Sequence, residues 1–231
     1  MTFLIAGFST AKAQSSPIEF LKFSGFSQRE ILLLKNDLQY LGQIQTAAGT
    51  PNLSRRFIYV GDKIDGAQLL TLLLSKIKTI ASNNSCPKSS DGCSRYGDDT
   101  IYINVAAHSS DNDFSRIIRL SIIIHEFFHL VDPTDHVNYP GLGAGDEHIF
   151  SAHGFTTIVM LNIAKFCSNC SQDFRGEAAW AAWHYHHYLP DYEWFFELTM
   201  REDCPQGFKT LPNPNPNIAS NDDLFPICNK Q

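Results

Sequence analysis

The strongest constraint on the fold of this chain is an apolar segment at residues 117–131 that contains two histidines and a glutamate. Its hydrophobic residues are too dense for a single helical stripe, which is typical of a helix that is covered on all sides. His125, Glu126 and His129 stand near its end, where polar side chains are costly to bury without a partner. We therefore expect a helix over residues 114–131 that runs through the centre of the domain.

The three polar residues have the spacing H-E-x-x-H. Positions i and i+4 of a helix lie on one face, so His125 and His129 can bind the same Zn²⁺ ion. Glu126 lies beside them, where its carboxylate can hold a zinc-bound water and take its proton. The sequence thus predicts a site for one zinc ion with Glu126 as the catalytic base. The alternative is a core helix whose two histidines are four apart by chance.

A catalytic zinc ion needs a third protein ligand and an open position for water. Three candidates follow His129 in the sequence: Asp135, His136 and Glu147. The first two come after a turn at Pro133, and Glu147 would approach from the next helix. The residues alone leave all three candidates open, and a residue that is not a ligand could instead orient a ligand histidine.

The segment T-D-H-V-N-Y-P-G at residues 134–141 follows this motif and makes a more specific comparison possible. It resembles the aspzincins, the deuterolysin and peptidyl-Lys metalloendopeptidase family, whose pattern is H-E-x-x-H followed by G-T-x-x-D-x-x-Y-G. The resemblance implies a zincin-like metalloprotease fold, with Asp135 as the third zinc ligand and Tyr139 as a catalytic residue that stabilises the oxyanion. The pattern is not identical, because one extra residue separates Asp135 from Tyr139 here.

A second segment, D-Y-E-W-F at residues 191–195, resembles a later part of the aspzincin pattern. In that family, acidic residues of this segment shape a pocket for lysine. The resemblance implies that Glu193 and Asp191 bind the substrate and that the enzyme prefers lysine-containing sites.

The chain has 231 residues, which suits one domain. We assign residues 14–205 to it, residues 1–13 to a signal peptide or its remnant, and residues 206–231 to a Pro/Asn-rich tail. The signal is inferred from a short apolar stretch before Ala11-Lys12-Ala13. With a net charge of −6 and no basic cluster, the chain is not expected to bind nucleic acid. No apolar stretch of the mature chain is long enough to span a membrane.

Six cysteines fit an exported chain with disulfides. Proximity in sequence favours the pairs Cys86–Cys93, Cys167–Cys170 and Cys204–Cys228. The second pair forms a C-x-x-C motif, but without a second such motif it indicates a disulfide or passive thiols rather than a redox centre.

Hydrophobic periodicity predicts an α+β domain in which helices dominate. A capping box at Ser27–Glu30 precedes the first helix, and Asp111 or Asp113 is expected to cap the central one. A loop held by a disulfide is expected at residues 82–99. Helices are expected at residues 31–44, 66–81, 114–131, 146–166, 174–188 and 191–201, and strands at 56–60 and 100–105. The strand at 100–105 leads to the central helix, where a sheet edge could bind an extended peptide.

Other polar and aromatic residues have simpler interpretations. Histidines at 184, 186 and 187 are more typical of an aromatic, partly exposed helix end than of a second metal site. His148 or His153 could face the cleft and stabilise the oxyanion. Trp180 is expected in the core or in the pocket wall.

Together these features predict a secreted or periplasmic zinc endopeptidase that acts as a monomer on proteins or peptides. An exported protease effector or toxin with one protein target would use the same site. A catalytically silent zinc-binding module is a third hypothesis. Glu126 argues against it, because a structural zinc site closes with four protein ligands and needs no such base.

Overall fold

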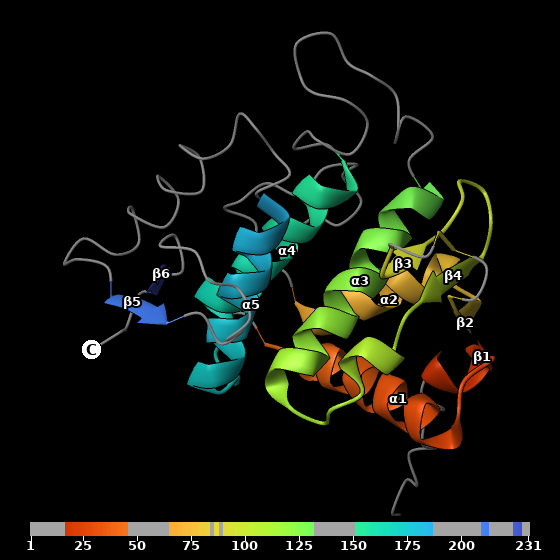
Figure 1. The fold of residues 1–231 in the computed structure, drawn as a ribbon, viewed down its shortest axis with the longest axis horizontal. Helices are drawn as coiled ribbons and strands as arrows, with labels where there is room; N and C mark the ends of the chain where they lie inside the picture. The colour runs from red at the N-terminus through yellow and green to blue at the C-terminus, as the bar shows by residue number, and fades with distance from the viewer. Residues whose placement is uncertain are drawn as a thin grey trace, which may run out of the picture.

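The computed structural model describes residues 17–45, 65–83, 86–87, 90–131 and 151–186, and two further strands at 209–212 and 224–227. Figure 1 shows helix α3 in the middle, with α4 and α5 on one side and α1, α2 and a small sheet on the other. The helices of this part are α1 (Gln28–Gln43), α2 (Gly66–Lys76), α3 (Asp113–Val131), α4 (Ala152–Phe166) and α5 (Gln172–His186). The fold is mixed α and β with helices predominating, as expected.

The main sheet has four strands in the order β1-β2-β4-β3. The strands are β1 (Lys22–Ser24), β2 (Thr79–Ser82), β3 (Gly92–Cys93) and β4 (Thr100–Ile103). The first two and β4 are parallel, whereas β3 is antiparallel to β4 and forms the edge beside α3. The predicted strand at 100–105 is therefore confirmed as β4, but it lies inside the sheet. The sheet edge next to β4 is formed by β3.

The predicted helix at 66–81 is too long at its C-terminal end. Helix α2 ends at Lys76, and residues 79–82 form β2 instead. The backbone of β2 pairs with β1 on one side and β4 on the other, so its hydrogen bonds are satisfied by distant segments. Pairing with these two strands makes residues 79–82 a strand, and local hydrophobic periodicity cannot detect such partners.

Helix α1 begins and ends through specific hydrogen bonds. The capping box is confirmed: the Ser27 side chain accepts from the backbone of Glu30, whose carboxylate accepts from the Ser27 N–H at 2.7 Å. At the other end, Gln45 N–H donates to Asn169 Oδ1 at 2.9 Å, and Ser168 N–H donates to Gln45 O at 2.8 Å. The loop between Cys167 and Cys170 thus covers the C-terminal end of α1.

Helix α3 is covered on nearly all sides, as its composition predicts. Its N-terminal cap differs from our expectation: Asn112 Oδ1 accepts the Ser115 N–H at 2.8 Å. Asp111 and Asp113 instead form ion pairs with Arg116 at 3.3 and 3.0 Å. A side-chain amide at this position satisfies one of the free N–H groups of the first turn.

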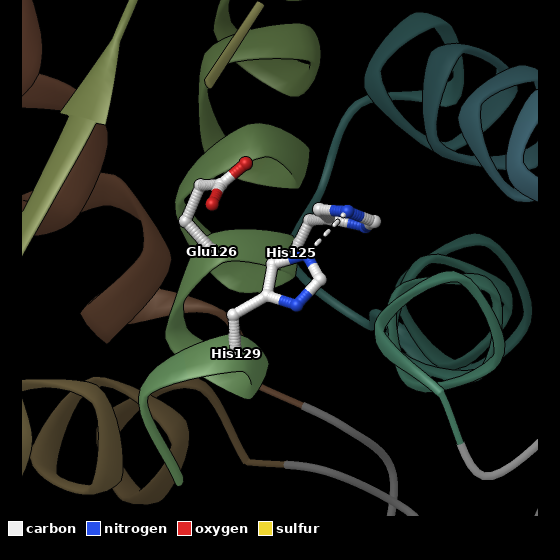
Figure 2. Close-up of side chains that lie close together, drawn as sticks. All are labelled: His125, Glu126 and His129. Carbon is white, nitrogen blue, oxygen red and sulfur yellow. Dashed lines mark hydrogen bonds between the residues drawn. The ribbon is translucent and has the colours of Figure 1, made fainter. Parts of the chain in front are cut away.

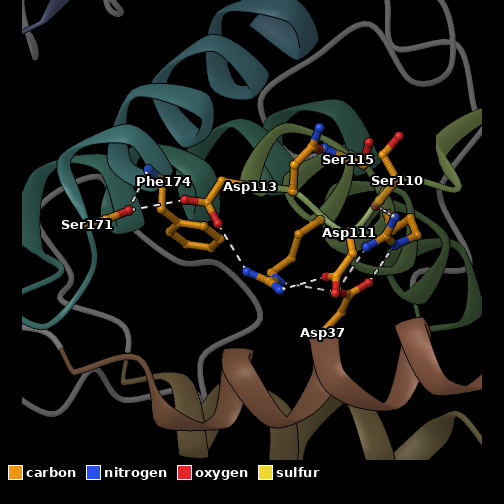
Figure 3. A network of polar contacts seen from close by, with 10 residues as sticks. Asp37, Ser110, Asp111, Asp113, Ser115, Ser171 and Phe174 are labelled. Atoms are coloured by element: carbon orange, nitrogen blue, oxygen red, sulfur yellow. Dashed lines mark hydrogen bonds and ion pairs between the residues drawn. The ribbon is translucent and has the colours of Figure 1, made fainter.

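A buried ion pair fixes α3 against α1 (Figure 3). Arg119 is 1% exposed and Asp37 is fully buried, and their side chains are joined at 2.6 Å. Arg119 also donates to the carbonyl oxygens of His108 and Ser110 before the helix. Burial raises the pKa of Asp37, and the hydrogen bonds and charges of Arg119 and Arg116 oppose this shift. The network therefore sets the position of α3 relative to α1 and to the segment that precedes it.

Two of the three predicted disulfides lie in the described residues and are confirmed, Cys86–Cys93 and Cys167–Cys170. Such bonds indicate an oxidising, extracytoplasmic environment. Within the described ranges, no helix combines the length and the hydropathy that a membrane span requires.

Helices α4 and α5 confirm two further predictions with shifted ends. Helix α4 starts at Ala152, where the Ser151 side chain caps it. Residues 146–150 of the predicted helix lie outside the described residues. In the tail, β5 (Lys209–Pro212) pairs antiparallel with β6 (Leu224–Ile227). The predicted signal, the strand at 56–60, the helix at 191–201 and the Cys204–Cys228 pair lie outside the described residues.

Candidate metal centre

The two histidines of the H-E-x-x-H motif meet on one face of α3 (Figure 2). Their Nε2 atoms are 3.1 Å apart, and their rings are nearly perpendicular. One ligand atom from each of His125, Glu126 and His129 lies within 4.8 Å of the others. The helical spacing therefore brings the two imidazoles together, with the carboxylate of Glu126 nearby, as the sequence predicts.

This donor set fits a metal ion. Two imidazoles on one tetrahedral zinc ion, each at about 2.0–2.1 Å, would hold their nitrogens about 3.3 Å apart. The observed separation of 3.1 Å between the two Nε2 atoms is close to that value. His129 is only 7% exposed, whereas His125 is partly exposed, so the two rings lie at the edge of the buried part of α3. We conclude that the site could bind a metal ion.

Glu126 is enclosed by the loop that carries β3. It is 4% exposed, and the Ser94 hydroxyl lies 2.9 Å from its Oε2 atom and 2.8 Å from its backbone oxygen. On the other side, a Cβ at Gly92 would stand 2.7 Å from Oε1 of Glu126. Because Gly92 has no side chain, the Glu126 carboxylate can occupy the space next to it.

Aromatic rings from α4 and α5 surround His125. The ring centroid of His153 lies 4.6 Å from that of His125, and the centroid of Tyr185 lies 5.5 Å from it. The Tyr185 hydroxyl in turn lies 3.4 Å from Oγ of Ser121, one turn earlier on α3. The prediction that His153 could face the site agrees with this placement, which restricts the orientation of the His125 ring.

The other residues assigned to the site lie outside the described residues: Asp135, His136, Tyr139, Glu147, Asp191 and Glu193. Their roles stay predictions. His148 lies outside as well. His184 stacks on the buried Trp180 with a ring separation of 5.2 Å. His187 lies outside the described residues.

Sequence reasoning missed three residues at the site, Ser94, Gly92 and Tyr185. Ser94 and Gly92 lie in a polar loop without periodicity, and only the pairing of β3 with β4 brings them to α3. Tyr185 lies in a run of aromatic residues, and nothing in the sequence indicated that this residue would contact His125. The nearby disulfide at Cys93 was the one signal that this loop is held in place.

Comparison of this chain with protein-family models, with curated proteins and with solved structures finds no match.

Proposed function

We propose that this chain is an extracytoplasmic zinc-dependent endopeptidase with a zincin-like domain. The observation that carries the proposal is the pair of Nε2 atoms of His125 and His129 at 3.1 Å, with the Glu126 carboxylate beside them on the same helix. A structural metal site would have no use for a buried acidic residue between two ligands, whereas a hydrolase needs a base there. The two disulfides support an exported protein.

His125 and His129 would hold the zinc ion, and Asp135 is our candidate for the third ligand, with His136 and Glu147 as alternatives. When bound, zinc supplies a Lewis acid that lowers the pKa of water and polarises a carbonyl group. The resemblance to aspzincins supports Asp135. Single alanine variants of the three candidates distinguish them, because the true ligand is the one whose loss abolishes stoichiometric zinc binding.

Glu126 would take the proton of the attacking water and pass it to the amine that leaves. Tyr139 would donate a hydrogen bond to the oxyanion as charge develops on it. In the described part of the chain, β3 pairs only with β4, so its other edge can accept an extended peptide by backbone hydrogen bonds. This edge lies beside α3, next to the proposed base.

Acidic side chains are our candidates for substrate recognition. Glu193 and Asp191 would attract a basic side chain through charge-assisted hydrogen bonds, so we expect cleavage beside lysine. Cleavage products from a peptide library, identified by mass spectrometry, test this expectation. No enrichment of lysine at any position would contradict it without affecting the proposed reaction.

The central experiment compares Glu126→Gln with the wild type and with Glu19→Gln, a change at an exposed carboxylate far along the chain. We expect about one zinc ion per chain in all three proteins and loss of casein cleavage in Glu126→Gln alone. Cleavage at the wild-type rate by that variant would refute the mechanism. Full zinc occupancy without turnover on any substrate would favour a silent binding module.

A further inference from the structure

The loop that follows β3 places a hydroxyl group on the proposed catalytic base. Oγ of Ser94 lies 2.8 Å from the backbone oxygen of Glu126 and 2.9 Å from Oε2 of its carboxylate. A serine hydroxyl has one proton, so it donates to one of these two acceptors at a time. Both acceptors belong to Glu126, so the Ser94 hydroxyl bonds to this residue whichever acceptor it uses.

The position of Ser94 is fixed on both sides. Before it, β3 pairs with β4, and Cys93 is bonded to Cys86. After it, the Gly97 N–H donates to the backbone oxygen of Leu130 in the last turn of α3. A residue between two such attachments has little freedom to move away from the helix.

Gly92 encloses the same carboxylate from the other side. A Cβ there would stand 2.7 Å from Oε1 of Glu126 and 2.8 Å from Cγ2 of Ile122. The Glu126 carboxylate is thus confined between the backbone of Gly92 and the hydroxyl of Ser94. Such confinement selects one orientation of a side chain that otherwise has several accessible rotamers.

We propose that Ser94 is a positioning residue that holds the Glu126 carboxylate in the orientation required for proton transfer. This inference rests on the proposed function, because it assigns the base its orientation. Loss of the Ser94 hydroxyl should lower kcat, since a misplaced base slows the chemical step but leaves the binding of substrate unchanged. Ser94 need not contact the metal ion or the substrate.

The test uses the full chain with Ser94→Ala, Ser94→Thr and Ser90→Ala. Ser90 is a matched control, because its hydroxyl lies in the same loop and donates to Pro87 O at 2.8 Å. We expect Ser94→Ala to lower kcat about 10- to 100-fold, with KM and zinc content unchanged. Ser94→Thr keeps the hydroxyl and should restore most of the rate, and Ser90→Ala should match the wild type.

A second measurement separates this inference from the proposed function. In protein labelled with ¹³C at the glutamate side-chain carboxyl carbon, the Glu126 resonance is assigned by its loss in Glu126→Gln. We expect it to shift or broaden in Ser94→Ala and to remain unchanged in Ser90→Ala, whether or not any substrate is cleaved. An unchanged resonance, or a Ser94→Ala enzyme with the wild-type kcat, overturns the positioning role. Absence of proteolysis in the wild type, with the resonance shift present, refutes only the proposed reaction.

Discussion

The Nε2 atoms of His125 and His129 lie 3.1 Å apart, one helical turn from each other in the mostly buried part of α3. Two ring nitrogens that face each other at this distance need a shared proton or a shared cation. A bound cation would be a partner for both ring nitrogens at once. This pair is the basis of the first prediction.

Replacing His129 with alanine should abolish stoichiometric zinc binding, because it removes one of only two imidazole ligands on α3. Zinc should raise the melting temperature of the wild type and leave that of His129→Ala unchanged, since a ligand stabilises only the state that binds it. Thermal unfolding with EDTA and with added zinc measures this. His184→Ala is the control, because His184 stacks on Trp180 on another helix. Equal zinc-dependent shifts in His129→Ala and the wild type would refute the site.

The buried ion pair between Asp37 and Arg119 should be essential for the position of α3. Arg119→Met leaves the Asp37 carboxylate buried without its main partner, which should cost about 3–5 kcal/mol in the free energy of unfolding. The double variant Asp37→Leu with Arg119→Met should cost less than the single change, because no unpaired charge remains. Asp111→Asn is a control, since the Asp111 side chain is 61% exposed and its pair with Arg116 should contribute about 1 kcal/mol or less. Urea unfolding of the wild type, Arg119→Met, the double variant and Asp111→Asn measures these differences. If the double variant is the least stable of the four, this account is wrong.

The two disulfides should differ in their effect on activity. Replacing Cys86 and Cys93 by serine removes a short loop closure, with a cost of about 2–3 kcal/mol, and releases the strand that holds Ser94 against Glu126. Replacing Cys167 and Cys170 should cost about 2 kcal/mol and loosen the loop that covers the end of α1. We therefore expect kcat to fall in the first variant and to stay near the wild-type value in the second. Equal rates in the two folded variants would mean that the Cys86–Cys93 bond has no role at the site.

Gly92→Ala should impair catalysis without removing zinc. The new Cβ would stand 2.7 Å from Oε1 of Glu126, so the carboxylate or β3 must shift. We expect a loss of kcat of about 10-fold or more, because small displacements of a catalytic group are costly. Gly97→Ala is the control for strain in this loop: its backbone has a φ of +83°, but its Cβ would meet no atom within 4 Å. A larger loss of kcat in Gly97→Ala than in Gly92→Ala would contradict the steric argument.

Glu177 on α5 should make stability depend on pH. Burial, together with the charges of Asp113 and Asp173, raises the pKa of Glu177 from 4.5 to about 7. Because this pKa is higher in the folded state, the folded chain binds more protons than the unfolded chain between pH 4.5 and about 7. The free energy of unfolding therefore falls as pH rises through this window. Glu177→Gln should remove the effect and be more stable than the wild type at pH 8, by roughly 1–3 kcal/mol after allowance for solvent screening. Urea unfolding at pH 5 and pH 8 measures it, with Glu19→Gln as an exposed control. A difference between Glu177→Gln and the wild type that is the same at both pH values would rule out this assignment.

The local sequence was sufficient to predict a structural feature wherever one segment contains all the groups that interact. The capping box of Ser27 and Glu30, the buried helix over residues 114–131 and the meeting of His125 with His129 depend on helical spacing alone, which is the same in any fold. The two short disulfides were also predictable, because their cysteines are seven and three residues apart.

Tertiary contacts decided the rest of the site. Residues 79–82 form a strand because β1 and β4 lie on either side of them, and Ser94 reaches Glu126 across 32 positions of sequence through the pairing of β3. His153 and Tyr185 approach His125 only because α4 and α5 pack against α3. Such contacts depend on the burial and pairing of segments far apart in the chain, and no local periodicity encodes them. The pair of histidines and the neighbouring Glu126 carboxylate thus follow from one helix, whereas the contact of that carboxylate with Ser94 depends on a loop whose place is set by the sheet.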